Sequence, residues 1–131
     1  SREGEKALAL MVERLKLTRL AGHVVDGPRG PAGRVKTGLI RLAHAADAVI
    51  VPFYVSADRA WHMKSWDRFM IPKPFSTLRI RYGAPRWVPR GATEKEMDAV
   101  AREIQEELRD FTLDLNPREG SLREEIDAQK E

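Results

Sequence analysis

The chain has 131 residues, 42% of them hydrophobic and 33% charged, which suits one folded domain and argues against wholesale disorder. It contains no cysteine, so disulfide frameworks and thiolate metal sites are excluded. The net charge is only +3, and no apolar run approaches the roughly 18 residues that a membrane-spanning helix needs.

The first half of the chain predicts a β-α-β unit. Apolar residues recur at helical spacing from Glu5 to about Leu20, and His23-Val24-Val25 has the character of a short buried strand at about 22–25. A second helical stripe covers 36–46, and the continuously apolar run 48–55 predicts a strand covered on both faces. Two strands joined by a helix of this length should be parallel neighbours.

The second half predicts a loop, a strand and a helix. Residues 57–75 hold four aromatic residues without a period, which indicates a long structured loop. The alternation in 77–83 predicts a strand of the same sheet with its arginines outward. Thr93 and Glu96 form a capping box for a helix that Asn116-Pro117 stops. We therefore expect an α/β fold in residues 1–116, a partial domain whose mixed, largely parallel sheet is flanked by helices, followed by a polar tail over 117–131.

Charge is distributed unevenly along the chain. Residues 59–90 carry eight basic residues and one acidic residue, whereas residues 91–131 carry six basic and thirteen acidic residues. A basic block favours an anionic partner such as phosphate, an acidic lipid surface or nucleic acid. Alternatively, it is a solvated face that pairs with the acidic C-terminal helix. No nucleic-acid motif accompanies the block, and we expect no nucleic-acid partner.

The loop that follows the first predicted strand is the best candidate site. Prolines and glycines in 26–31 rule out regular structure, and glycines let backbone N–H groups approach an anion closely. An arginine fork suits phosphate oxygens. Five consecutive residues are therefore candidate phosphate-binding residues: Asp26, Gly27, Pro28, Arg29 and Gly30.

Several motifs together resemble the lysophospholipid acyltransferase superfamily, in a bacterial branch long classed as a domain of unknown function. The resemblance covers roughly residues 1–90 and rests on motifs in the order seen there: 26–31, Val35-Lys36 with Gly38, Ile50-Val51-Pro52, 65–69 and 71–76. It implies an enzyme of phospholipid biosynthesis that transfers an acyl chain from acyl-coenzyme A or acyl carrier protein to a hydroxyl of a phosphate-bearing lipid acceptor.

The superfamily binds the acceptor phosphate with a Glu-Gly-Thr-Arg stretch. The resemblance places Asp26 at the glutamate, Gly27 at the glycine and Arg29 at the arginine of that stretch. Pro28 replaces the threonine, and Gly30 stands where a serine is common. Because two hydroxyl donors are missing, the acceptor here is expected to differ from lysophosphatidic acid or glycerol phosphate.

The resemblance also implies a catalytic His-x4-Asp pair upstream of this loop, and the chain has no such pair there. It opens with Ser1-Arg2-Glu3 rather than methionine, so we expect it to be truncated at its N-terminus and to contain no catalytic residue. His62 and Asp67 have the right spacing but follow the loop, which favours an accidental match. His23 is expected in the core and His44 at a surface or between helices.

Three scattered histidines supply no metal-ligand cluster, and no cofactor is expected. The aromatic and basic residues around Trp61 and Trp66 suit either contact with an anionic membrane or packing of the loop on the sheet. The leading hypothesis is an acyltransferase fragment at the cytoplasmic face of the membrane. The alternative is a non-catalytic α/β module that binds phosphate or an anionic membrane surface.

Overall fold

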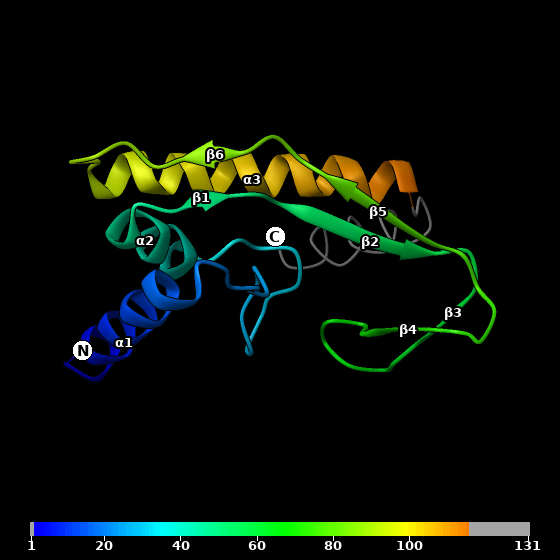
Figure 1. Ribbon diagram of the computed structural model, residues 1–131. Helices are drawn as coiled ribbons and strands as arrows, with labels where there is room; N and C mark the ends of the chain where they lie inside the picture. Colours follow the sequence, from blue (N-terminus) through cyan, green and yellow to red (C-terminus); the bar gives the residue numbers. More distant parts are fainter. Residues whose placement is uncertain (1, 116–131) are drawn as a thin grey trace.

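The computed structural model describes residues 2–115, in which three helices and six short strands follow one another along the chain (Figure 1). The helices and strands are α1 (Arg2–Thr18), α2 (Thr37–Ala46), β1 (Val49–Ile50), β2 (Phe53–Ala57), β3 (Ala60–His62), β4 (Met70–Pro72), β5 (Leu78–Tyr82), β6 (Arg86–Trp87) and α3 (Glu94–Leu115). The three predicted helices are confirmed. The predicted tail over 117–131 lies outside the described residues.

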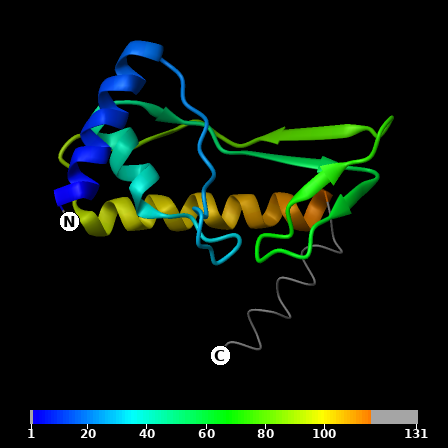
Figure 2. The ribbon, with the colours of Figure 1, turned by 90° about the horizontal axis from the view of Figure 1, so that it is seen from below.

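Helix α3 runs along one side of a long antiparallel ribbon (Figures 1 and 2). The ribbon consists of β1 paired with β6 and β2 paired with β5, and α1 and α2 gather at one of its ends. The capping box that starts α3 is present: the Thr93 hydroxyl accepts the Glu96 N–H at 3.2 Å, and the Glu96 carboxylate accepts the Thr93 N–H at 2.7 Å.

The expected largely parallel sheet is wrong. Among the described residues the sheets are two-stranded and every pair is antiparallel, because the chain reverses after β2 and returns alongside it as β5 and β6. The predicted strand at 22–25 is absent; this segment is irregular, and the Val24 side chain is exposed. Two antiparallel strands need only a turn between them. A parallel pair here would need a crossover connection and a further strand along the free edge of β1 and β2.

The loop predicted over 57–75 is instead a second hairpin, formed by β3 and β4. Trp61 lies opposite Ile71, and the Met63 N–H donates to the Phe69 carbonyl at 3.0 Å. The hairpin begins at the end of the ribbon that is opposite α1 and α2, and it turns back beneath the ribbon (Figure 1).

Strand β5 has the alternation predicted for 77–83, but its faces are reversed. The Arg81 guanidinium lies 4.7 Å from the centre of the Phe111 ring on α3 and pairs with Asp114 at 2.8 Å. The apolar residues Leu78, Ile80 and Tyr82 point away from α3 and are exposed. The acidic flank of α3 explains the reversal, because it attracts the arginine face of the strand.

The core lies between α2, α3 and the strands β1 and β6. Ile40 and Ile104 have no exposed surface, and the buried residues around them include Ile50, Val88 and Met97. The apolar stripe predicted on α3 contributes Met97 and Ile104 to this core, with Val100 and Leu108 partly buried against it.

Candidate functional site

The loop Asp26–Gly30 is shaped by its glycines and by the Asp26 carboxylate. Gly27 and Gly30 have φ angles of 70° and 59°, a region in which residues with a Cβ are strained. The Asp26 carboxylate accepts the Gly33 N–H at 3.1 Å and so ties the start of the loop to its end. The Lys36 N–H donates to the Val25 carbonyl at 2.8 Å and closes the base of the loop. The first candidate residue, Asp26, therefore has a structural role in the loop.

Arg29 occupies the exposed tip of this loop, next to the exposed Pro28. A structural role for Arg29 would require it to pair with Asp26 or with a nearby carbonyl. Within residues 2–115, however, no hydrogen bond or ion pair of its guanidinium is found. The fork of donors on Arg29 is thus available to an anion from solvent.

Gly30 is buried against the second hairpin. A Cβ added at Gly30 would lie 2.6 Å from a carbon of the Trp66 ring, closer than atoms can approach without displacement. Trp66 therefore packs against the glycine loop, although 48% of its surface is exposed. Trp66 was expected either to contact a membrane or to pack the long loop on the sheet; the contact found is with the glycine loop and not with the sheet. This contact brings the 26–31 and 65–69 motifs together.

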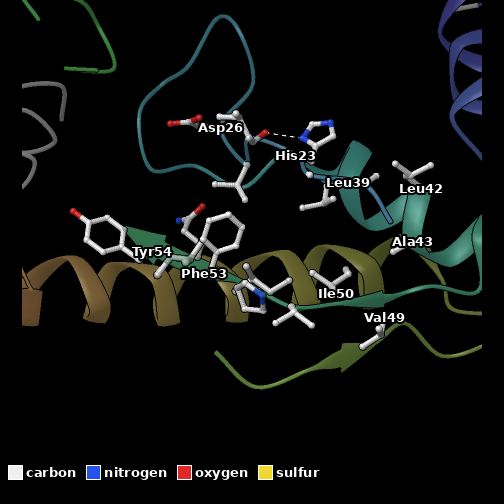
Figure 3. Close-up of a pocket in the computed structure, with 18 of the residues that line it drawn as sticks. His23, Asp26, Leu39, Leu42, Ala43, Val49, Ile50, Phe53 and Tyr54 are labelled. Atoms are coloured by element: carbon white, nitrogen blue, oxygen red, sulfur yellow. Dashed lines mark hydrogen bonds between the residues drawn. The ribbon is translucent and has the colours of Figure 1, made fainter. Parts of the chain in front are cut away.

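A cavity of about 1550 Å³ lies between this loop, the helices and the ribbon (Figure 3). Its wall includes every residue from Ala48 to Val55, from both faces of the strands, so the cavity follows the free edge of β1 and β2. In Figure 3, His23 and Asp26 lie on the loop side of the cavity, across from the strands, and helix α2 lies at one end. The labelled apolar wall consists of Leu39, Leu42, Ala43, Val49, Ile50 and Phe53.

The walls of the cavity are mainly apolar and its charged lining residues are mainly basic. Four basic residues line the cavity, namely Lys16, Arg19, Arg34 and Arg109, and two carboxylates do, Asp26 and Asp47. Arg90 donates a hydrogen bond to Asp47 at 2.7 Å and lowers the pKa of that carboxyl, so Asp47 stays ionised and its negative charge is offset by the guanidinium. A lining of this kind suits a ligand with an apolar chain and an anionic head.

The sequence analysis missed Val51 and Phe53 as candidate binding residues. Both belong to the run that was expected to be covered on both faces, yet 44% of Val51 and 53% of Phe53 remain exposed on the wall of the cavity. The continuous apolarity of this run was the signal. It was interpreted as a buried strand because sequence alone does not distinguish a core from an apolar binding surface.

The histidines form no catalytic pair within residues 2–115. His62 lies on β3, while the Asp67 carboxylate accepts a hydrogen bond from the Ser65 hydroxyl, and no hydrogen bond joins His62 to Asp67. His23 is exposed on the wall of the cavity, so its expected core position is wrong. Its Nδ1 lies 2.7 Å from the Val24 carbonyl, to which it can donate. His44 is half-buried on α2.

Two further findings concern only residues 2–115. No group of three or more metal-ligating side chains is found there. No helix in that range is both long and apolar enough to cross a membrane.

The chain is similar to an uncharacterized protein of Rickettsia prowazekii (strain Madrid E), with 38% identity over 72 residues. The matched residues make up 53% of this chain and 33% of that protein. The chain therefore spans about a third of the length of this curated relative. No model of a protein family matches the chain, and no solved structure matches it.

Proposed function

We propose that this chain is part of an acyltransferase that moves an acyl group from a thioester donor to a hydroxyl of a phosphate-bearing lipid acceptor. One observation carries the proposal: within residues 2–115 the Arg29 guanidinium makes no hydrogen bond or ion pair, and it stands on a glycine loop whose first residue, Asp26, lines a large, mainly apolar cavity. The resemblance of the loop and of the 65–76 motifs to lysophospholipid acyltransferases supports the same assignment.

In this proposal each part of the site has one task. Arg29 and the loop N–H groups bind the acceptor phosphate, because a guanidinium fork and glycine backbone suit its oxygens. The apolar wall of the cavity, with Val51 and Phe53, receives an alkyl chain. Asp26 holds the loop in shape through the Gly33 N–H rather than contacting the phosphate.

At the acyl carbon the reaction forms one bond and breaks one bond, and a proton moves from the acceptor oxygen to the sulfur. The acceptor oxygen attacks the thioester carbonyl carbon, a carbon–oxygen ester bond forms, and the carbon–sulfur bond breaks. A general base takes the hydroxyl proton, which finally resides on the departing thiol. We assign no residue of this chain to that base. The donor, acyl-coenzyme A or acyl carrier protein, acts as a substrate, and the enzyme works in peripheral contact with the cytoplasmic membrane.

The substitution Arg29→Lys tests the phosphate-binding task in the complete enzyme. Lysine keeps the charge but loses the bidentate fork, so we expect the Michaelis constant for the acceptor to rise about tenfold or more. The Michaelis constant for the donor and the thermal midpoint should stay unchanged. Arg102→Lys, on the exposed side of α3, is the matched control. An unchanged acceptor constant with a lowered midpoint would show that Arg29 is structural.

A second candidate function is a module that binds phosphate or an anionic membrane surface without catalysis. The lack of a hydrogen bond between His62 and Asp67 favours it for residues 2–115 taken alone. Both candidates predict that the 131-residue chain binds a lysophospholipid but does not acylate it with acyl-coenzyme A. Turnover that His62→Ala abolishes would contradict this expectation and would assign the base to His62.

A further inference from the structure

The β3–β4 hairpin and the turn that follows it expose an unusual set of side chains. They form a surface, here called the hairpin surface, that consists of the exposed Trp61, Met63, Phe69, Ile71, Phe75 and Lys64 and the half-buried Arg68 and Lys73. Each of its five apolar members is at least 39% exposed. Large apolar side chains concentrated on one projecting element mark an interaction surface rather than scattered exposure.

Phe75 is the most exposed of these residues, with 99% of its surface accessible, and it has a φ angle of 60°. For a bulky residue with a Cβ this left-handed conformation is strained. The turn is held in place by its neighbours. The Arg59 guanidinium donates to the carbonyls of Pro74 and Phe75 at 3.3 and 3.2 Å, and the Ser76 N–H donates to the Lys73 carbonyl at 3.2 Å. These hydrogen bonds therefore hold the Phe75 backbone in a strained conformation while its phenyl ring is exposed to solvent.

The charges around these apolar residues are almost all positive. Residues 59–79 contain five basic residues and one acidic residue, Asp67, which already accepts the Ser65 hydroxyl. Lys64, Arg68 and Arg79 make no ion pair with other residues in 2–115. By contrast, Arg81 and Arg86 pair with the acidic flank of α3. The basic block is therefore divided, and only its hairpin half remains available to an external anion.

We infer that the hairpin surface docks on an anionic lipid bilayer, with Phe75 inserted among the acyl chains and the lysines and arginines at the level of the headgroups. Aromatic side chains flanked by cations suit this boundary, since the rings enter the apolar layer and the charges stay at the phosphates. Lys73, whose ammonium lies 5.7 Å from the centre of the Trp61 ring, already shows such a pairing. The inference rests on the hairpin alone and does not require acyl transfer.

Two features favour a bilayer over a nucleic-acid partner. Ile71 and Phe75 have no hydrogen-bond donor or acceptor in their side chains and the Met63 thioether is only a weak acceptor, so these residues do not suit contacts with the polar edges of bases. The hairpin turns back beneath the ribbon instead of packing on α3 (Figure 1), and its large apolar side chains remain exposed.

Co-sedimentation with vesicles tests the inference on the 131-residue chain. We expect binding to vesicles of phosphatidylcholine mixed with phosphatidylglycerol, weaker binding at high salt, and little binding to phosphatidylcholine alone. The substitution Phe75→Asn should lower the partition coefficient about ten- to hundredfold, the worth of burying a phenyl ring. Because asparagine tolerates a left-handed φ, the thermal midpoint should stay equal or rise. Phe75→Leu should retain most of the binding.

Matched controls separate the hairpin from general charge and hydrophobicity. Trp87→Asn removes a 65% exposed aromatic residue on β6, and Arg102→Glu changes the net charge by the same amount as Arg68→Glu. Arg68→Glu changes the charge by two units, and each unit near the membrane changes binding roughly fivefold. We therefore expect Arg68→Glu to lower vesicle binding roughly tenfold or more, and both controls to have small effects.

Three results would overturn the inference. The first is equal binding by the wild-type chain and Phe75→Asn. The second is equal binding to vesicles with and without phosphatidylglycerol. The third is the loss, in Phe75→Asn, of a dimer or of binding to a single-stranded oligonucleotide, since either would assign the surface to a second copy or to nucleic acid. Loss of lysophospholipid binding in Arg29→Lys with vesicle binding intact would leave the inference standing, because the two sites are tested separately.

Discussion

The contact between Gly30 and Trp66 predicts a large and separable loss of stability for Gly30→Ala. Two effects add in this variant. Alanine at a φ of 59° costs about 1–2 kcal/mol, and a Cβ placed 2.6 Å from the Trp66 ring adds about 1–3 kcal/mol of overpacking. The free energy of unfolding should therefore fall by roughly 2–5 kcal/mol, which is a large fraction of the stability of a domain of this size.

A double-mutant cycle with Trp66→Ala separates the two effects. In the Trp66→Ala background the backbone term remains, with a 3.3 Å contact of the added Cβ with the Ala32 N, so Gly30→Ala should still cost about 1–2 kcal/mol there, and the cycle should give a coupling of about 1–3 kcal/mol. Urea unfolding followed by far-ultraviolet circular dichroism measures all four proteins. Gly22→Ala is the control, because a Cβ at Gly22 meets nothing within 4 Å. An equal cost of Gly30→Ala in both backgrounds would refute the packing of Trp66 on the loop.

Three further substitutions test the scaffold around the site. Glu107 accepts hydrogen bonds from Arg86 at 2.9 Å and from the Ala84 N–H at 3.2 Å. Burial raises the pKa of Glu107, but the two hydrogen bonds and the Arg86 charge together lower it by more, so the net shift of the pKa is downward. A lowered folded-state pKa contributes stability above the unfolded value of about 4.3 and loses it as the pH falls through the folded value. Glu107→Gln should thus cost about 1 kcal/mol in urea unfolding at pH 7 and almost nothing at acidic pH, and a pH-independent cost would contradict the assignment. A Cβ at Gly38 on α2 meets nothing within 4 Å, so Gly38→Ala should raise the free energy of unfolding by about 0.5–1 kcal/mol and with it the thermal midpoint. A lower midpoint would show that another segment packs closely on Gly38. Thr93→Ala removes the cap of α3 and should cost about 1 kcal/mol, and no change would mean that the capping box is not formed.

The helices could be predicted from sequence because their signals are local. The stripe from Met97 to Phe111 and the Thr93–Glu96 capping box depend on residues three or four apart, and both are present. Strand pairing is not local. The alternation of 77–83 predicts a strand, but the partner of that strand and the face toward α3 depend on distant residues such as Asp114 and Phe111.

The candidate site was also predictable only in its local features. The run from Asp26 to Gly30 was identifiable because glycine, proline and arginine in this order restrict the backbone and supply a cation. That Asp26 binds the Gly33 N–H, while Arg29 is left unpaired within residues 2–115, could not be predicted, since hydrogen-bond partners depend on the path of the loop.

By itself the sequence determined the positions of the three helices, the shaped loop and the concentration of positive charge in residues 59–90. Only the tertiary structure decided which of these basic residues form ion pairs within the chain. Arg81 and Arg86 lie within reach of carboxylates on α3, whereas Lys64 and Arg68 lie on a hairpin that projects away from α3. The physical reason is that an ion pair needs two charges within about 4 Å, and that distance is set by how the chain folds back on itself rather than by its local order of residues.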